Sequence, residues 1–200
     1  RRLNRLVENL LDVSRIEGGF ELKLEYHDPA DVVSAAMTDV EDRSGEFRFQ
    51  LNVMPDLKPF RMDGGLIVTA LSNLILNAIQ HAPAGSEITI SVEETEGRLR
   101  LSIADHGPGI PPEQIESIFE RFYRARNTVP GGLGLGLYIA RTFARAHGGD
   151  VRAANRLGGH RHRRLALHRR RRHLGAEERG PHQPQHAVHR ARRGIARAVC

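Results

Sequence analysis

Apolar residues recur at spacings of three and four in two segments of the chain, and each segment predicts an amphipathic helix. In residues 1–17 the apolar positions are Leu3, Leu6, Val7, Leu10, Leu11 and Val13. Gly18 and Gly19 then end the pattern, as glycine commonly does after a helix. The apolar stripe needs a partner helix, and none is nearby in the sequence. This segment is therefore typical of the end of a helical hairpin or dimeric bundle.

The second helix is predicted at Leu66–Ala82 and has one apolar and one polar face. The apolar face consists of Ile67, Ala70, Leu71, Leu74, Ile75, Ala78 and Ile79. The polar face consists of Thr69, Asn73, Asn77, Gln80 and His81. Two further helices are predicted, one over 31–40 behind Asp28-Pro29 and one over 135–146, which Gly148-Gly149 ends.

Alternating apolar and polar residues predict strands at 20–26, 47–53, 60–62, 87–93, 98–104 and 150–154. A short turn around Glu96-Gly97 joins two of them into a hairpin, and Pro111-Pro112 opens a short helix that reaches Phe122. Strands and helices mix without strict alternation, and the hairpin lies in the middle. The order therefore favours an α/β fold, a two-layer sandwich of a mixed β-sheet and helices, over a doubly wound parallel sheet.

Charge is distributed unevenly along the chain. Residues 158–200 hold twelve arginines, seven histidines and two glutamates, a net charge of +10, so residues 1–157 carry −4 of the total of +6. The basic character belongs to this tail, and a nucleic-acid partner is not expected for the body of the protein.

The tail, residues 158–200, has three interpretations. It is a disordered basic arm, a tether to nucleic acid or another acidic surface, or the product of a shifted reading frame. Arg, His, Ala, Gly and Pro without Lys are typical of GC-rich DNA read out of frame. The third interpretation predicts that the shift begins near Gly158 and replaces the last strand of the sheet.

Two classes of protein are disfavoured by the sequence. The single cysteine, Cys200, cannot form a disulfide framework or a cysteine metal cluster within one chain. No apolar run approaches the roughly 18 residues of a membrane span, and no signal peptide opens the chain. We expect a cytoplasmic domain.

Asparagine is the chemically distinctive residue of the second helix. Asn73 and Asn77 lie one turn apart on its polar face. An asparagine carbonyl oxygen is a hard, neutral ligand that suits Mg²⁺, which usually keeps several waters and bridges phosphate oxygens. Taken alone, both residues are better explained as solvated helix positions, and the motifs that follow change this.

Two glycine-containing loops add to this pattern. Asp105 stands where a strand ends, and Gly107 and Gly109 allow a ligand to approach the backbone closely. A carboxylate at this place can accept a hydrogen bond from the amino group of adenine, although Asp, Gly and Pro also make ordinary turns. The run 131–137, GGLGLGL, leads into a helix whose first N–H groups favour phosphate oxygens. It is neither a Walker A loop nor a GxGxxG fingerprint.

A polar loop, residues 124–131, connects the phenylalanine-rich segment to these glycines. Such a loop can close over a nucleotide as a lid, with Arg124 or Arg126 neutralising phosphate charge. Phe119 and Phe122 are expected to anchor the base of this lid in the core.

Four motifs in this order resemble a known family: NLILNA at 73–78, DHGPGI at 105–110, FERF at 119–122 and GLGLGL at 132–137. They resemble the N box, first glycine box, F box and second glycine box of sensor histidine kinase catalytic domains. These domains have a Bergerat-type ATP-binding fold and belong to the gyrase–Hsp90–histidine kinase–MutL superfamily. The resemblance covers residues 20–157. Residues 1–19 resemble the end of the dimerisation and phosphotransfer hairpin that precedes such domains.

The resemblance implies a role for each matching position. It implies that Asn77 is the Mg²⁺ ligand and that Asn73 replaces the glutamate with which ATP-hydrolysing relatives activate water, so both are expected in the catalytic centre. Asp105 is implied as the adenine-recognising carboxylate, with Gly107 and Gly109 shaping its loop. The phosphate side is implied to consist of Gly132, Gly134 and Gly136.

The chain departs from the family pattern at three places. Gln80 stands where a basic phosphate contact is common, the phosphoacceptor histidine is missing, and the last strand is expected to be replaced by the tail. His81, His106 and His147 do not match the acceptor context and are expected at the surface or in the pocket wall.

The resemblance implies an ATP- and Mg²⁺-dependent protein-histidine kinase. It transfers the γ-phosphoryl group to a histidine of the missing hairpin, for relay to a response regulator. The parent protein is then expected to form a homodimer through the hairpin and to lie at the bacterial inner membrane. Two alternatives stay open: a non-catalytic nucleotide-binding module, and an ATPase of the gyrase or Hsp90 type.

Overall fold

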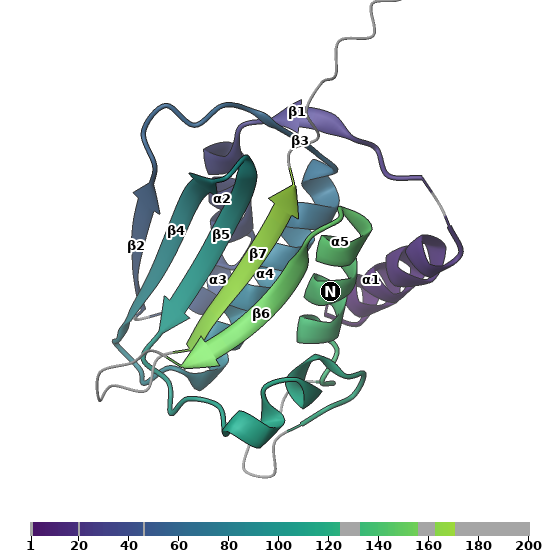
Figure 1. The fold of residues 1–200 in the computed structure, drawn as a ribbon. Coiled ribbons are helices and arrows are strands. Elements are labelled where there is room, and N and C mark those ends of the chain that lie inside the picture. The colour runs from purple at the N-terminus through teal and green to yellow at the C-terminus, as the bar shows by residue number, and fades with distance from the viewer. Residues whose placement is uncertain (1, 20, 46, 125–132, 156–162, 171–200) are drawn as a thin grey trace, which may run out of the picture.

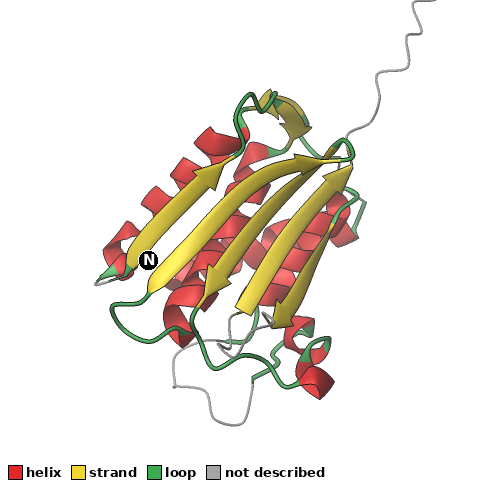
Figure 2. Cartoon of the chain, turned by 60° about the vertical axis from the view of Figure 1, so that its left-hand side comes forward, coloured by secondary structure: helices red, strands yellow, loops and turns green. Residues whose placement is uncertain are grey.

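The computed structural model describes residues 2–19, 21–45, 47–124, 133–155 and 163–170. A five-stranded mixed sheet forms one layer, in the strand order β2-β4-β5-β7-β6. The helices α2, α4 and α5 cover one face of this sheet (Figures 1 and 2). The two-layer α/β sandwich predicted from the sequence is confirmed.

The hairpin at the centre of the sheet consists of β4 (Glu87–Thr95) and β5 (Arg98–Asp105). Glu96 and Gly97 connect the two strands with φ angles of 53° and 69°, the left-handed values that a tight two-residue hairpin turn requires. Alternation places one apolar set of side chains against the helices, and these are all buried: Ile88, Ile90, Val92, Leu99, Leu101 and Ile103.

The remaining strands extend the sheet on both sides. β2 (Arg48–Val53) pairs parallel with β4 and forms one edge, and β6 (Asp150–Asn155) forms the other. β7 (Arg163–Arg170) lies between β5 and β6 and is antiparallel to both. The expectation that the last strand is lost, and that the tail has no secondary structure, is therefore wrong for 163–170. Backbone pairing on both sides provides hydrogen bonds whatever the side chains are.

Helix α4 (Gly64–His81) is the core of the helical layer. Asp63 caps it, since its Oδ1 accepts from Leu66 N at 3.3 Å, and the helix therefore begins two residues earlier than predicted. α2 (Pro29–Asp39), α3 (Glu41–Ser44) and α5 (Gly136–Ala146) complete the layer, and α4 contacts α2, α3 and α5. Leu71, Leu74 and Ile75 of α4 are at most 1% exposed, as the apolar face predicted.

Two predicted elements differ from the structure. The strand expected at 20–26 is reduced to β1 (Glu25–His27), because only these residues pair with β3 (Phe60–Met62). Instead, Lys23 N donates to Asp63 Oδ2 at 3.1 Å.

The helix expected from Pro111 to Phe122 consists of two 3-10 turns, η1 (Pro112–Gln114) and η2 (Ser117–Phe119). The chain becomes extended at Glu120, with ψ at 152°, directly after the buried Phe119.

Helix α1 (Arg2–Glu17) packs its C-terminal half on α5, where Val13 is 3% exposed and Ile16 is partly buried. The partner of this half therefore lies within the chain, on a helix that is distant in the sequence. Val7, Leu10 and Leu11 are 41–54% exposed on the remaining surface of α1.

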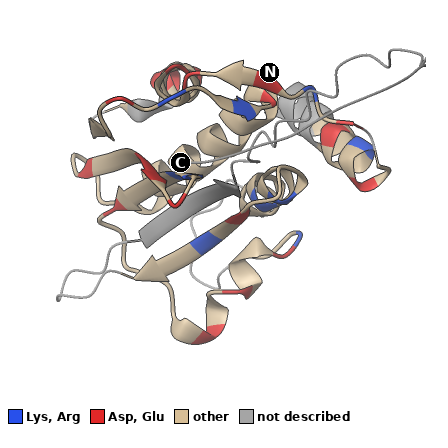
Figure 3. Cartoon of the chain, turned by 45° about the horizontal axis from the view of Figure 1, so that its top comes forward, with Lys and Arg blue, Asp and Glu red and all other residues tan. Residues whose placement is uncertain are grey.

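Acidic and basic residues are interspersed along the described elements (Figure 3). Among the described residues, no helix combines the length and apolar character needed to cross a membrane.

Candidate functional site

The asparagine-bearing face of α4 is half-buried beneath the start of α5. Asn73 Nδ2 donates to Thr69 O at 2.9 Å, which fixes the amide and leaves its Oδ1 pointing away from the helix backbone. A Cβ on Gly136 would lie 3.1 Å from this Oδ1. The glycine therefore allows the first turn of α5 to lie directly against Asn73, and Asn77 follows one turn later on the same face of α4.

Asp105 is held rigidly at the end of β5. The residue is 1% exposed, and its Oδ1 accepts from Gly107 N at 2.7 Å. A Cβ on Gly107 would lie 2.6 Å from this Oδ1 and 3.0 Å from the carbonyl oxygen of His81, at the end of α4. Only glycine fits between the carboxylate and the helix end, so this loop and α4 form one continuous surface.

The rest of the first glycine box is tied to the sheet. Gly109 has a φ of 78°, a conformation that favours glycine. Ile110 N donates to Asn155 Oδ1 at 2.9 Å, and Asn155 Nδ2 donates to Ile110 O at 2.7 Å. The side chain of Asn155 thus bonds both backbone groups of Ile110, as a neighbouring strand would. Sequence reasoning missed this residue, because a polar position at the end of a strand carries no signal for a contact 45 residues away.

Glycine also shapes the start of α5. Gly134 has a φ of 69°, and a Cβ there would lie 2.5 Å from Tyr123 O and 2.8 Å from Phe122 C. Among the described residues, the N-cap Leu135 provides no side-chain hydrogen bond to the first turn of α5, whose N–H groups suit a phosphate. Arg124 is exposed, while Gly132 and Arg126, which were also predicted for this side, lie outside the described residues.

The described residues suit Mg²⁺ only if phosphate and water provide most of its ligands. No group of three or more His, Cys, Asp or Glu side chains that could hold a metal occurs in the described part of the chain. An asparagine oxygen on a rigid helix, beside glycine turns that bring backbone N–H groups close, fits an ion that takes its other ligands from phosphate and water.

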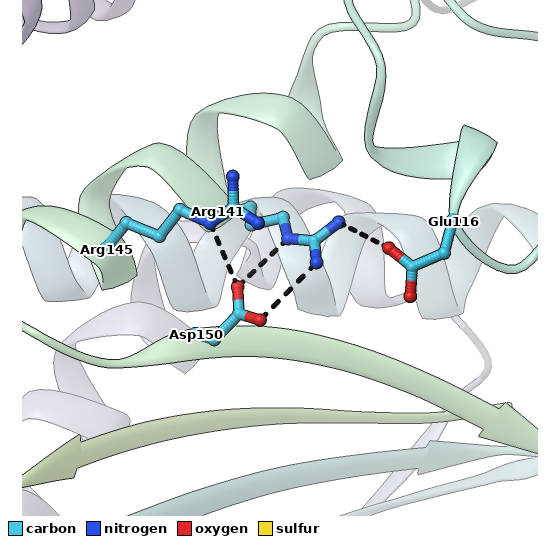
Figure 4. A network of polar contacts seen from close by, with 4 residues as sticks. All are labelled: Glu116, Arg141, Arg145 and Asp150. Atoms are coloured by element: carbon cyan, nitrogen blue, oxygen red, sulfur yellow. Dashed lines mark hydrogen bonds and ion pairs between the residues drawn. The ribbon is translucent and has the colours of Figure 1, made fainter.

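Behind the site, Arg141 of α5 forms a charge network with three other residues, which we call the Arg141 cluster: Glu116, Arg141, Arg145 and Asp150 (Figure 4). Arg141 Nε donates to Asp150 Oδ1 at 2.9 Å, and Nη1 donates to Glu116 Oε2 at 3.0 Å. Burial alone would raise the pKa of Asp150, but the hydrogen bond and charge of Arg141, with the charge of Arg145, lower it overall. The hydrogen bond that Arg141 donates to Asp150 raises the pKa of Arg141.

His147 joins the two helices of the site at their far ends. It is 8% exposed, and its Nε2 accepts from Asp63 N at 3.0 Å, while Nδ1 lies 2.7 Å from Phe143 O. The expectation of a surface or pocket-wall histidine is wrong for His147, because it links the cap of α4 to the last turn of α5. His106 is exposed, as expected, and His81 is partly exposed.

A second network, the Arg121 cluster, links α1 to the site: Glu17, Arg121 and Tyr138. Arg121 Nη2 and the Tyr138 hydroxyl both donate to Glu17 Oε1, and the guanidinium lies 4.7 Å from the centre of the Tyr138 ring. The hydrogen bond from Tyr138, followed by that from Arg121, lowers the pKa of Glu17. The hydrogen bonds to Glu17 and Tyr138 raise the pKa of Arg121.

With this geometry established, comparison with known proteins identifies the family. Residues 62–171 match the family described as "Histidine kinase-, DNA gyrase B-, and HSP90-like ATPase". Because this match covers more than half of the chain, the chain belongs to this family. The matched range includes β7, in agreement with its place in the sheet.

The relatives are sensor histidine kinases. The chain is 40% identical over 158 residues to the sensor protein KdpD of Escherichia coli, covering 78% of this chain and 17% of KdpD. The structure of the histidine kinase AdeS of Acinetobacter baumannii matches with a TM-score of 0.68 at 27% identity, covering 84% of this chain and 78% of that one. Full-length ShkA in complex with AMPPNP matches with a TM-score of 0.67 at 28% identity, covering 83% of this chain and 35% of that one.

The chain spans 17–41% of the length of the curated relatives that it matches. Its residues 62–171 correspond to the histidine kinase-like ATPase domain.

Proposed function

We propose that this chain is the ATP-binding catalytic part of a two-component sensor histidine kinase, and that the site above binds ATP with Mg²⁺. The observation that carries the proposal is the convergence of Asp105, the Asn73–Asn77 face and the Gly134–Gly136 turn on one surface. Three segments far apart in the sequence meet there, and glycine at 107, 134 and 136 allows the close contacts. The matched ShkA structure, a complex with AMPPNP, supports it.

Each group has a distinct task in this proposal. The carboxylate of Asp105, fixed by Gly107 N, accepts a hydrogen bond from the adenine amino group. The N-terminus of α5 receives phosphate oxygens, and Arg124 adds positive charge, as we also propose for Arg126 and Gly132. Asn77 would hold Mg²⁺, which would supply neutralisation of the phosphate charge.

The reaction that we propose is phosphoryl transfer to histidine. The bond between the γ-phosphorus and its bridging oxygen breaks, ADP leaves, and a bond forms to an imidazole nitrogen of the acceptor, which gives up its proton. The chain's contribution is positioning and charge neutralisation. Asn73 provides no carboxylate to activate water, because its amide is neutral, and this favours transfer over hydrolysis.

The partners follow from the same proposal. Helix α1 exposes Val7, Leu10 and Leu11, an apolar surface that fits the other helix of a hairpin and a second copy of the parent protein. We propose that the acceptor histidine lies on that hairpin, that a response regulator receives the phosphoryl group, and that the parent is a membrane-associated sensor with this part in the cytoplasm.

Calorimetric titration of ATP–Mg²⁺ into the purified chain tests nucleotide binding. Asn77→Ala should weaken binding about tenfold and remove the dependence of affinity on Mg²⁺. Asp105→Asn should weaken binding of ATP and of adenosine alike. The matched control Asn52→Ala, on the exposed edge strand β2, should bind as the wild type does. Unchanged affinity in both site variants contradicts the proposal.

A second assay separates the three candidate activities. The chain is incubated with [γ-³²P]ATP and a separately purified hairpin that carries a histidine. Acid-labile label on the hairpin supports the kinase. ADP formation without label indicates an ATPase of the gyrase or Hsp90 type, and nucleotide binding with neither product indicates a non-catalytic module.

A further inference from the structure

Arg141 has no part in the roles assigned above, although it has the most connected side chain near the site. It lies on α5, five residues after Gly136, and its side chain is 14% exposed. Its contacts reach two other elements, β6 and the 3-10 segment 112–119.

We propose that Arg141 is a positioning residue for the phosphate side of the nucleotide site. It holds α5 against the 3-10 segment and β6, and this keeps the Gly134–Gly136 turn in place beside Asn73. The inference rests on the proposed nucleotide binding and assigns to it a residue that does not contact the nucleotide.

The contacts of Arg141 are directional. Nε and Nη2 donate to the two oxygens of Asp150 at 2.9 and 3.4 Å, and Nη1 donates to Glu116 at 3.0 Å. The guanidinium carbon lies 4.5 Å from the centre of the buried Phe119 ring. A planar guanidinium satisfies two carboxylates and an aromatic face at once, whereas a lysine ammonium cannot reproduce the fork.

The 3-10 segment and α5 are also linked closer to the site, through the residues that follow the segment and those that precede the helix. The chain that Arg141 holds at Glu116 and Phe119 continues to Phe122 and Tyr123, whose backbone packs on Gly134. Arg141 lies about 7.5 Å along the helix axis from Gly136, at the rise of an α-helix. Because α5 is a rigid rod over this distance, loosening the Arg141 contacts allows the segment to rotate against α5. The close contact at Gly134 then changes, and with it the turn beside Asn73.

Arg145 provides a matched comparison one turn further on. It also bonds Asp150, at 3.2 Å, but it is 60% exposed, and the described contacts with Glu116 and Phe119 belong to Arg141. Replacing Arg145, like replacing Arg141, removes an arginine of α5 that is paired with Asp150. It leaves the link between α5 and the 3-10 segment intact.

The test compares affinities for ATP–Mg²⁺ and for adenosine, which lacks the phosphates. Arg141→Met should weaken ATP binding about tenfold and change adenosine binding less than about twofold, and Arg141→Lys should weaken ATP binding about threefold. Arg145→Met should bind both ligands as the wild type does. The melting temperature of each variant is recorded, so that affinities are compared at a temperature where all variants are folded.

Each outcome has a defined meaning. A selective loss of ATP affinity that Arg141→Lys partly restores supports the inference. Equal losses for ATP and adenosine indicate a purely structural arginine and overturn it, as does wild-type ATP affinity in Arg141→Met. If Arg141→Met does not fold, Arg141→Lys and Glu116→Gln are compared with the wild type by the ratio of ATP affinity to adenosine affinity. A wild-type ratio in both variants overturns the inference. A wild-type chain that binds neither ligand overturns the proposed function itself, and the inference with it.

Discussion

The Arg141 and Arg121 clusters have similar chemistry and different surroundings. In the Arg141 cluster the side chain of Arg141 is 14% exposed and that of Asp150 is 28% exposed, and all members belong to the ATP-binding domain. In the Arg121 cluster the arginine is 52% exposed and Glu17 44%, and the contact joins α1 to that domain. Exposed ion pairs contribute little to the free energy of unfolding because water screens them. Removing one partner of a partly buried pair, in which one arginine binds both carboxylate oxygens, costs more stability. The first cluster therefore suits permanent architecture and the second a reversible contact between elements.

The largest effect is expected from Arg141→Met. It leaves Asp150 partly buried without its main partner and removes the contact with Phe119, so we expect a loss of about 2 kcal/mol in the free energy of unfolding. Urea denaturation measures it. The control Arg145→Met should change the same quantity by less than about 0.5 kcal/mol. Equal effects would show that burial does not distinguish these arginines.

A smaller effect, dependent on pH, is expected from Asp150→Asn. The folded-state pKa of Asp150 is lowered, so its ion pairs stabilise the fold above the unfolded-state pKa of about 4 and are lost as the pH falls through the lower folded value. The wild type should be more stable than Asp150→Asn at pH 6, and the difference should shrink as the pH falls below about 4 and through the lower folded-state pKa. Denaturation curves from pH 6 to pH 2.5 measure this difference. A constant difference down to pH 2.5 would contradict it.

Glu17→Gln should have a still smaller effect on global stability and a larger one on helix docking. Loss of the carboxylate charge weakens its bonds with Arg121 and Tyr138, so amide hydrogen exchange in α1 should become faster while β4 and β5 keep wild-type protection. The wild-type helix should respond in the same way to 1 M NaCl, because exposed charges are screened. Unchanged exchange in α1 under both conditions would show that Val13 and Ile16 alone hold the helix.

The smallest effect is expected from Tyr138→Phe. It removes the hydrogen bond that the hydroxyl donates to Glu17 and the one that it accepts from Arg121, but keeps the ring beneath Arg121 and the direct Arg121–Glu17 pair. Exchange in α1 should lie between wild type and Glu17→Gln. An effect larger than that of Glu17→Gln would indicate that the hydroxyl, rather than the charge pair, is the main contact.

Regular elements were largely predictable from local pattern. The apolar stripe of α4, the hairpin with its Glu96-Gly97 turn and the cap at Asp28 depend on residues close in sequence, and all occur in the structure. The predictions failed where distant partners decide. β1 is short because β3 pairs with three residues only, and β7 forms because β5 and β6 offer backbone partners on both sides.

The residues of the candidate site also divide into those identified from the sequence and those found only in the structure. The motif residues Asn73, Asn77, Asp105, Gly107, Gly109, Gly134 and Gly136 were identified from the sequence, and their roles stay predictions. Arg141, His147 and Asn155 were missed as supports. Their partners on other elements lie 9 to 84 residues away in the chain, and no local spacing indicates such contacts.

The sequence by itself determined the periodicities of α4, β4 and β5 and the residue types able to bind a nucleotide, because these follow from short-range geometry and side-chain chemistry. Only the tertiary structure decided that Gly136 lies against Asn73, that Gly107 fits between Asp105 and the end of α4, and that Arg141 joins three elements. Such contacts depend on how whole helices and strands pack, and packing is a property of the complete core rather than of any one segment.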